Sequence, residues 1–278
     1  MQAAEAVKAG SAGAPQAALE ADYLRFDVLP AGIARVTDEV IGAERLMGGL
    51  ADAACGPVRV AAFDFDGTSI DGNSPVTLVR YLGMRRRLSP GNLFLILLWA
   101  GAYKVRLPQN EAWVRGRVFS AFKGKPVGKV NKYLWRFYDT EVDARFRPAA
   151  GAEMQRHLDA GHAVVCVSAS FEPIIAKAMT RHPIQFGIAT RMQVTPEGTY
   201  LNRVLGKPTE GPAKLEALAR FADERFGKGN WVLDSAYGDH HSDRALLAAA
   251  EHAFAVCPDR PLTRTARERS YAVLDWER

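Results

Sequence analysis

Cysteine is scarce in this sequence of 278 residues, which contains only Cys55, Cys166 and Cys257. Their number is odd, they lie far apart, and their spacing does not match that of zinc-binding cysteines. This scarcity argues against a disulfide framework and is typical of a protein from a reducing compartment.

Long apolar runs are also missing. The longest one, residues 93–105 (LFLILLWAGAYKV), is well short of the roughly 20 apolar residues that a membrane-spanning helix needs. The N-terminal segment (MQAAEAVKAGSAGAPQAALEA) lacks the basic and then apolar order of a secretory signal. We therefore expect a cytoplasmic protein that does not cross a membrane.

The sequence shows no zinc-finger, homeodomain or aromatic RNA-binding motif, so nucleic acid is not an expected partner. Its net charge of +5 nevertheless hides a strong asymmetry. Residues 73–145 contain 14 basic and 4 acidic residues, whereas the rest of the chain contains 22 basic and 27 acidic ones. Such a basic block focuses positive potential toward anions.

From residue 58 onward, short apolar runs alternate with helical patterns. Buried strands are predicted at residues 58–63, 163–167, 231–233 (continuing toward Tyr237) and 253–256. Helices are predicted at residues 149–160, 172–180, 212–226 and 243–251. This alternation predicts a doubly wound α/β domain with a parallel sheet, and residues 192–205 predict an added β-hairpin around Pro196-Glu197-Gly198.

The first strand is separated from the others by a long, mostly helical segment. Connections between strands are usually much shorter, so we expect residues 73–146 to form an inserted helical cap. Residues 57–72 and 147–278 then form the core. Residues 1–56 form an N-terminal extension that we expect to be disordered at first and helical over residues 31–54.

Two aspartates, Asp64 and Asp66, follow the first strand in the sequence DFDGT. Side chains two residues apart in an extended chain point the same way, so both carboxylates should project into one site. Beside one cation, the first carboxylate can attack while the second handles protons. The alternative interpretation is a loop with an Asp-Gly turn and a capping threonine.

Two further polar residues lie where anions bind. Ser168, followed by Ala169, ends the second strand, where a hydroxyl and free backbone N–H groups at a helix start form an anion site. The alternative is a plain N-cap. Lys214 lies in the first turn of a predicted helix, where cations are mildly disfavoured, so it indicates an anionic partner unless it is a solvated surface lysine.

The sequence GDHHSD follows the third strand and supplies Asp239 and Asp243. Two acids that face Asp64 would complete an oxygen-rich site suited to Mg²⁺. His240 and His241 raise the alternative of zinc. We expect adjacent histidines to point in two directions, and the carboxylates favour magnesium.

Taken together, DxDGT, the serine, the lysine and GDxxxD resemble the haloacid dehalogenase superfamily, in particular its phosphoserine-phosphatase-like branch (subfamily IB). The similarity begins near Val58 and extends to the C-terminus, including Phe146-Arg147-Pro148, the hairpin that ends at Gly206, and Cys257-Pro258-Asp259. The resemblance implies a Rossmann-like core with a helical cap and a magnesium-dependent phosphatase activity.

The resemblance also implies a role for each site residue. Asp64 would attack phosphorus and form an aspartyl phosphate, and Asp66 would protonate the leaving oxygen and then activate water. The implied phosphate-binding residues are Ser168, Ala169 and Lys214. The implied magnesium ligands are Asp64, the Asp66 carbonyl and Asp239, with support from Asp243. The reaction needs alignment and charge neutralisation, which such a set provides.

Two residues of the insertion bear on the substrate. Phosphoserine phosphatases place a glutamate at the position of Asn73 to bind the substrate ammonium, and the acid is missing here. Arg117 matches an arginine that binds the substrate carboxylate in that branch. The resemblance thus implies that Asn73 and Arg117 bind substrate, with phosphoserine a poor one.

We therefore expect an enzyme that hydrolyses a small phosphorylated metabolite or a lipid phosphate. One alternative is a phosphotransferase that uses the same intermediate. Another is a catalytically silent module that binds anionic membranes through its basic insertion, although the intact Asp64 and Lys214 argue against silence. Peripheral membrane contact is predicted because arginines and lysines flank the apolar residues 93–102.

Overall fold

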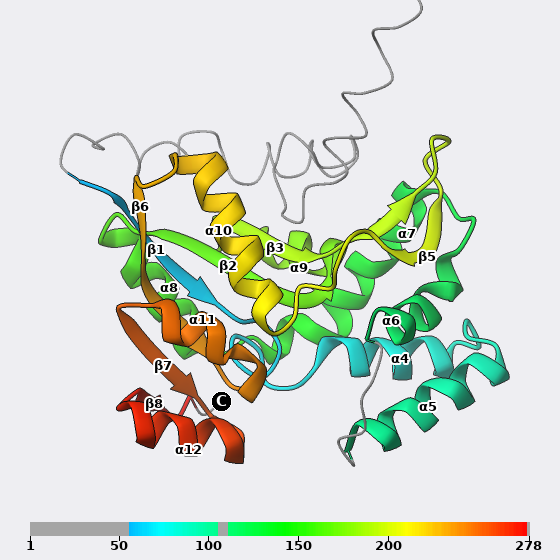
Figure 1. Cartoon of the computed structure of the whole chain (residues 1–278). Coiled ribbons are helices and arrows are strands. Elements are labelled where there is room, and N and C mark those ends of the chain that lie inside the picture. The colour runs from blue at the N-terminus through cyan, green and yellow to red at the C-terminus, as the bar shows by residue number, and fades with distance from the viewer. Residues whose placement is uncertain (1–55, 105–110, 277–278) are drawn as a thin grey trace, which may run out of the picture.

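A computed structural model describes residues 56–104 and 111–276. The predictions of disorder and of a helix over residues 31–54 lie outside these residues. Within them, six parallel strands form one sheet in the order β3-β2-β1-β6-β7-β8 (Figure 1). The strands are β1 (Val58–Phe63), β2 (Ala163–Phe171), β3 (Phe186–Thr190), β6 (Trp231–Gly238), β7 (His252–Val256) and β8 (Ala272–Leu274). The predicted α/β class with a parallel sheet is confirmed.

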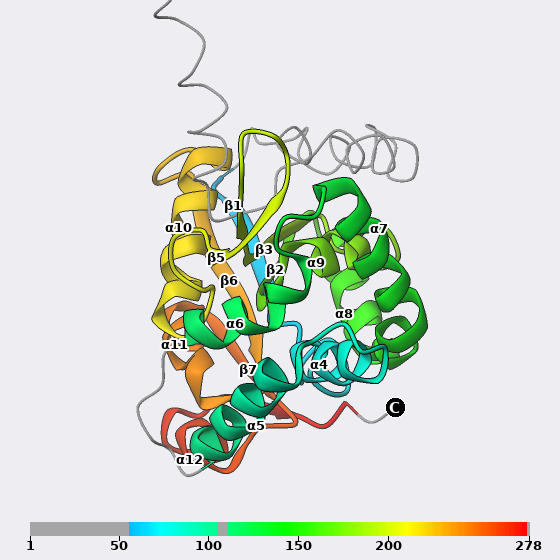
Figure 2. The same cartoon turned by 90° about the vertical axis from the view of Figure 1, so that its right-hand side faces the viewer.

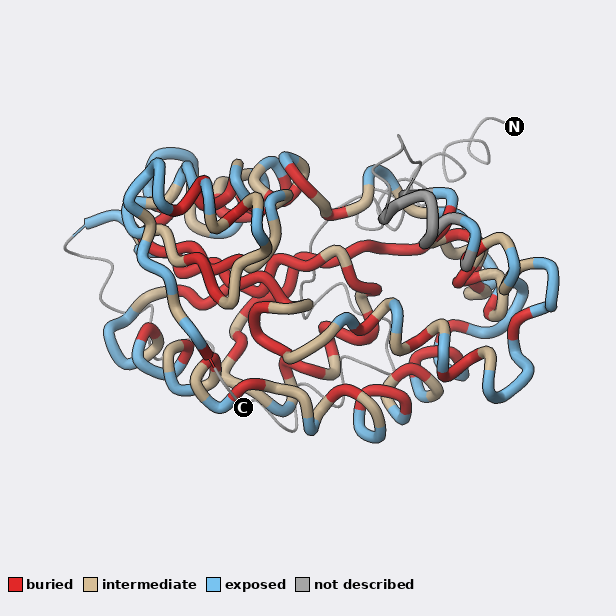
Figure 3. The backbone as a smooth tube through the Cα atoms, turned by 90° about the horizontal axis from the view of Figure 1, so that it is seen from below, coloured by how far each residue is buried: buried red, intermediate tan, exposed pale blue. Residues whose placement is uncertain are grey.

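Helices cover both faces of this sheet, because the central strands are apolar on both sides. In β1, Ala61 and Phe63 face one hydrophobic cluster, whereas Val60 and Ala62 face another. The first cluster includes α8 (Pro148–Asp159) and α9 (Glu172–Met179). The second includes α10 (Pro212–Phe226), α11 (Arg244–Ala249) and α12 (Arg260–Arg269). Buried backbone is accordingly concentrated in the central strands (Figure 3).

Between β1 and β2 the chain forms further helices, which gather at one end of the sheet (Figure 2). They are α4 (Ser74–Met84), α5 (Pro90–Lys104), α6 (Glu111–Phe119) and α7 (Val127–Phe137). Their apolar side chains continue the first cluster, since the Phe119 ring lies 4.8 Å from the ring of Phe171 in β2. The division of the chain into a core and a cap domain stays a prediction.

The predicted hairpin is confirmed as β4 (Met192–Val194) and β5 (Tyr200–Val204). It lies against α6, where a Cβ added to Gly116 would come within 2.6 Å of the Asn202 carbonyl oxygen. Glycine is therefore required for this close approach. Backbone hydrogen bonds from Gly124 to Tyr200 and from Val127 to Gly198 also tie the inserted helices to the hairpin.

In the described parts of the chain, no helix is both long enough and apolar enough to cross a membrane.

The strand at residues 58–63 and the helix at residues 212–226 have the predicted bounds. The predicted helix 243–251 is shorter, because residues 241–243 form a 3₁₀ turn and α11 ends at Ala249.

Candidate active site

The carboxyl ends of β1, β2 and β6 meet at one edge of the sheet, since these strands are adjacent and parallel (Figure 1). Asp64 follows β1, Ser168 lies near the end of β2, and Asp239 follows β6. The backbone N–H of Asp64 donates to the carbonyl of Tyr237, which fixes the first aspartate to the neighbouring strand. This edge is where open parallel sheets bind ligands.

Lys214 lies at the centre of the candidate site. Its ammonium group is 2.7 Å from Asp64 Oδ1 and 2.6 Å from Asp243 Oδ1, and the residue is only 3% exposed. Burial alone would lower the pKa of Lys214, but Asp243 and Asp64 outweigh it and raise that pKa above its usual value. The alternative of a solvated surface lysine is therefore wrong.

Three carboxylates gather around this cation. Asp64, Asp239 and Asp243 each offer an oxygen, and these atoms lie within 4.8 Å of one another. Burial raises the pKa of Asp64 well above its usual value and, together with Asp243, raises that of Asp239 to about 7. Three carboxylates can carry more negative charge than the one positive charge of Lys214 balances, and their donor atoms are all oxygens. The group therefore fits a hard divalent cation such as Mg²⁺.

Two glycines make room for these carboxylates. A Cβ added to Gly67 would overlap Asp239 Oδ2, and Gly67 has a φ of +81°. A Cβ added to Gly238 would lie 2.8 Å from the Cβ of Asp243. The glycine in DFDGT is therefore needed for Asp239 to approach the loop after the first strand, and the glycine in GDHHSD is needed for Asp243 to approach the end of β6.

The carboxylate cluster makes metal binding and stability depend on pH. In the metal-free folded protein Asp239 titrates near pH 7, against a usual value of 3.8. The folded state thus holds the extra proton between about pH 4 and pH 7, so its stability falls as the pH rises through this window. Mg²⁺ requires the deprotonated carboxylate, so we expect its affinity to weaken about tenfold for each pH unit below 7.

Calorimetric titration of Mg²⁺ at several pH values between about 5.5 and 8 measures this effect. Glu268→Gln, which changes an exposed carboxylate paired with Arg264, is the matched control and should give the wild-type profile. A Mg²⁺ affinity that stays constant across this range would contradict the expected protonation of the cluster.

Asp66 is hydrogen-bonded to a different set of residues from the other aspartates of the site. Its Oδ1 accepts the backbone N–H of Ser74 at 2.5 Å, and its Oδ2 accepts the hydroxyl of Ser170 at 2.5 Å. Burial raises the pKa of Asp66, and the hydrogen bond from Ser170 partly offsets the effect. A carboxyl group whose pKa is raised is suited to exchange protons at neutral pH. Ser170 was not among the predicted site residues.

Ser168 lies inside β2, because this strand continues to Phe171 instead of ending at residue 167. Ser168 pairs with Ala189 and Phe171 with Thr190, so Ala169 and Ser170 form a bulge. The Ser168 hydroxyl accepts the N–H of Ser170 at 3.0 Å. The alternative of an N-cap at Ser168 is wrong, because α9 begins at Glu172, as predicted, and its N-cap is Phe171. Bulges of this kind often lie beside active sites.

Of two arginines on α6, Arg115 is the one that contacts this bulge. Its Nε donates to the Ala169 carbonyl at 3.3 Å, and its guanidinium pairs with Glu210 at 2.5 Å. Arg117, two residues further on, is on a different side of the helix and donates to Asn92 Oδ1 at 3.1 Å. Arg115 was not predicted, and the role of Arg117 in substrate binding stays a prediction.

Asn73, the other predicted substrate residue, caps α4. Its Oδ1 accepts the N–H of Val76 at 2.9 Å, and the side chain is exposed. An asparagine is well suited to this capping position. Its contact with a substrate stays a prediction.

The two histidines of GDHHSD do not point in two directions, so that expectation was wrong. Their ring centroids are 4.1 Å apart, and both face Asp259 Oδ2. The reason is local backbone geometry: His240 is extended, whereas His241 begins a 3₁₀ turn. They form a group separate from the three carboxylates.

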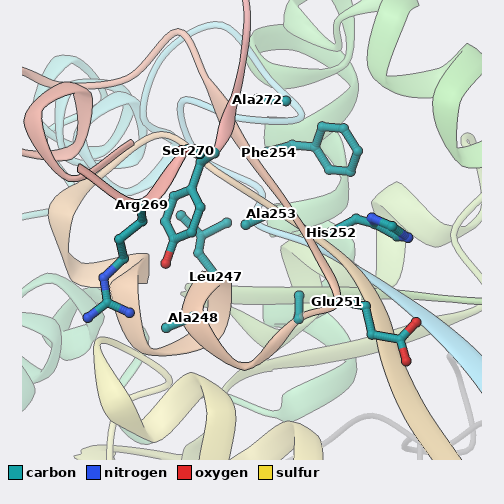
Figure 4. A pocket seen from close by; sticks show the side chains of 11 residues that line it. Leu247, Ala248, Glu251, His252, Ala253, Phe254, Arg269, Ser270 and Ala272 are labelled. Carbon is teal, nitrogen blue, oxygen red and sulfur yellow. The ribbon is translucent and has the colours of Figure 1, made fainter. Parts of the chain in front are cut away.

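A pocket beside α11, β7 and β8 is lined by other residues (Figure 4). Its lining includes Leu247, Glu251, Phe254, Arg269 and Ser270. None of the predicted site residues lines this pocket, so it is separate from the carboxylate cluster and from Lys214.

Comparisons with known proteins give one matching family model and several named relatives. The model of the haloacid dehalogenase-like hydrolases matches residues 61–248. A relative named phosphoserine phosphatase SerB1 from Mycobacterium tuberculosis is 25% identical over 219 residues, covering 78% of this chain and 70% of that protein. A histidinol-phosphatase from Neisseria meningitidis is 27% identical over 230 residues, covering 79% of this chain and 99% of that protein.

A solved structure of a Bordetella pertussis protein of unknown function shares the fold. Its TM-score is 0.72 at 20% sequence identity, and the match covers 80% of this chain and all of that one. The fold of this chain is therefore also found in an experimental structure.

Proposed function

Since the chain belongs to the haloacid dehalogenase-like hydrolases, we propose that it is a magnesium-dependent phosphomonoesterase that acts through an aspartyl phosphate on Asp64. One observation carries the proposal: a buried lysine holds Asp64 beside two further carboxylates at the carboxyl edge of the sheet. A carboxylate fixed in this way can approach phosphorus, while Lys214 and a bound cation would neutralise the phosphoryl oxygens.

In this proposal Asp64 attacks phosphorus as the bond to the leaving oxygen breaks, and that oxygen takes a proton from Asp66. Asp66 then removes a proton from the water that cleaves the acyl phosphate. Lys214, Ser168 and the Ala169–Ser170 bulge hold the phosphoryl oxygens. Asp64, Asp239 and the Asp66 carbonyl would hold Mg²⁺, with Asp243 in support, and the ion would supply charge neutralisation.

A phosphate-release screen tests this function. We expect Mg²⁺-dependent release of phosphate from one or more phosphorylated metabolites, loss of that release with EDTA, and recovery with Mg²⁺ rather than Zn²⁺. Added alcohols separate hydrolysis from phosphotransfer, because a transferase would form new phosphate esters. Unchanged turnover after complete metal removal would contradict the proposal.

Arg115 is a candidate positioning residue for the phosphate-binding bulge. Arg115 reaches the Ala169 carbonyl from the inserted helices, so its displacement should move the phosphate-binding bulge. We expect Arg115→Ala to lower kcat/KM by about ten- to a hundredfold, since small misplacements of positioning groups have effects of this size. Arg117→Ala, on the same helix, is the matched comparison.

Steady-state kinetics on the best substrate from the screen measures both variants. An equal or larger loss in Arg117→Ala would restore Arg117 to the role that the sequence predicts. Thermal melts of both variants show whether either change also disturbs the fold.

Exposed apolar side chains favour a substrate with an apolar tail as a second candidate. Met84, Phe94 and Leu98 are 70%, 65% and 60% exposed, and Arg85 to Arg87 follow Met84 directly. Arginines near an anionic membrane contribute about 1 kcal/mol each to binding. Lipid phosphates of increasing chain length belong in the same screen, and activity that rises with chain length would support this candidate over a soluble metabolite.

A further inference from the structure

A second group of metal-type ligands lies next to the carboxylate cluster. His240 and His241 come from the turn after β6, and Asp259 is the N-cap of α12. His240 Nε2 is 3.1 Å from His241 Nδ1, and the two nitrogens are 3.5 and 3.4 Å from Asp259 Oδ2. The three atoms thus form a nearly equilateral triangle.

This triangle has the size that a tetrahedral zinc ion requires. Bonds of about 2.0–2.1 Å to nitrogen and oxygen place tetrahedral ligand atoms about 3.3 Å apart. One observed distance, 3.1 Å, is slightly shorter than this value, and the other two, 3.4 and 3.5 Å, are slightly longer. Two imidazoles and one carboxylate favour zinc over magnesium, which prefers an all-oxygen set.

Neighbouring groups orient each ligand. Asp259 Oδ1 accepts the N–H of Leu262 at 2.7 Å, which leaves Oδ2 directed at the histidines. Ser242 approaches His240 Nδ1 with its hydroxyl at 3.0 Å and with its backbone N–H at 3.3 Å, so that Nε2 lies toward His241 and Asp259. Metal binding at Nε2 requires the ring proton on Nδ1, where it is donated to the Ser242 hydroxyl and the contact with the N–H is given up. Such supporting hydrogen bonds are typical of metal ligands. His241 is exposed and the other two are half-buried, so an ion can enter from solvent.

We propose that His240 Nε2, His241 Nδ1 and Asp259 Oδ2 bind a transition metal ion, preferentially Zn²⁺, at a second site separate from the magnesium site. Water completes the tetrahedron. The backbone N–H of Asp259 donates to the Asp239 carbonyl at 2.8 Å, so the ion ties the loop of Asp239 to the start of α12. Metal binding at this second site therefore stabilises the loop that contains Asp239.

A rival group, His157, His162 and Asp234, also has ligand-type atoms close together. Its carboxylate is already bound by Arg59 and Ser235, and His157 is hydrogen-bonded to Tyr237. The charge of Asp234 is therefore balanced without an ion, which makes this group the weaker candidate and a useful control.

The test uses the full chain with saturating Mg²⁺, titrated with Zn²⁺ by calorimetry and with Co²⁺ by visible absorption. We expect one equivalent of Zn²⁺ to bind and Co²⁺ to give the bands of tetrahedral cobalt. Asp259→Asn keeps a side chain that can cap α12 but removes the anionic ligand. His241→Ala removes an imidazole ligand that is exposed to solvent. Each should weaken Zn²⁺ binding at least tenfold and abolish the bands.

His162→Ala should bind Zn²⁺ as the wild type does. Zinc lost in His162→Ala but kept in His241→Ala would overturn the proposal in favour of the rival group. Zinc kept in both but lost in Asp64→Asn would place the ion at the catalytic carboxylates and overturn it as well. These readouts need no turnover, so they stand apart from the proposed phosphatase activity.

Discussion

Asp64→Asn should lower turnover by about 10⁴-fold or more, the range seen when enzymes lose a nucleophile. An amide has nearly the shape of the carboxylate but cannot form an acyl phosphate. Its oxygen can still accept hydrogen bonds from Lys214 and from the N–H of Phe65, which Asp64 Oδ1 accepts at 2.7 Å. The fold should therefore be retained, as circular dichroism and thermal melts would show.

Beryllium fluoride provides the control for this variant. It mimics a phosphoryl group on a carboxylate, so it should inhibit the wild type and should not bind to Asp64→Asn. Turnover close to that of the wild type in Asp64→Asn would remove Asp64 from the mechanism.

Lys214→Met should destabilise the metal-free protein by about 3–5 kcal/mol at neutral pH, the cost of breaking a buried ion pair by removing one partner. Lys214 is the cation shared by Asp64 and Asp243, and both carboxylates are buried. Without it their negative charge is uncompensated. The loss should be smaller at about pH 5, where the carboxyl groups take up protons, and saturating Mg²⁺ should recover part of it.

Chemical denaturation with and without Mg²⁺ measures the effect. Lys207→Met is the matched control, because Lys207 is exposed and pairs with the exposed Glu216 at 3.7 Å. That change should cost less than about 1 kcal/mol. Equal stabilities of the two variants would contradict the buried, doubly paired environment of Lys214.

Much of the sheet could be predicted because its central strands are buried on both faces. The runs at residues 58–63 and 163–167 consist almost wholly of apolar residues, and they are central in the sheet. The strands β3 and β8 were missed. Each lies at an edge of the sheet. β8 has only three residues, two of them exposed, and the five-residue β3 contains Gly187, a residue type that is depleted in strands. The helix α12 was missed since only three of its residues are buried.

The candidate site was predicted from short motifs. The site residues that the sequence analysis missed were missed for a different reason from the strands. Ser170 contacts Asp66, 104 residues away in the chain, and Arg115 contacts Glu210 at a separation of 95 residues. Neither contact leaves a local pattern, because each joins segments that only the folded chain brings together. The orientation of His240 depends in the same way on the backbone of a single turn.

The most direct test of the central claim is to trap the intermediate. Wild-type protein is mixed with its best substrate and Mg²⁺, quenched in acid during turnover, reduced with borohydride and analysed by peptide mass spectrometry. An acyl phosphate on Asp64 is reduced to homoserine, so we expect homoserine at residue 64 only when substrate is present. Active protein in which Asp64 stays unmodified while a phosphoryl group appears on Ser168, Ser170 or a histidine would contradict the account.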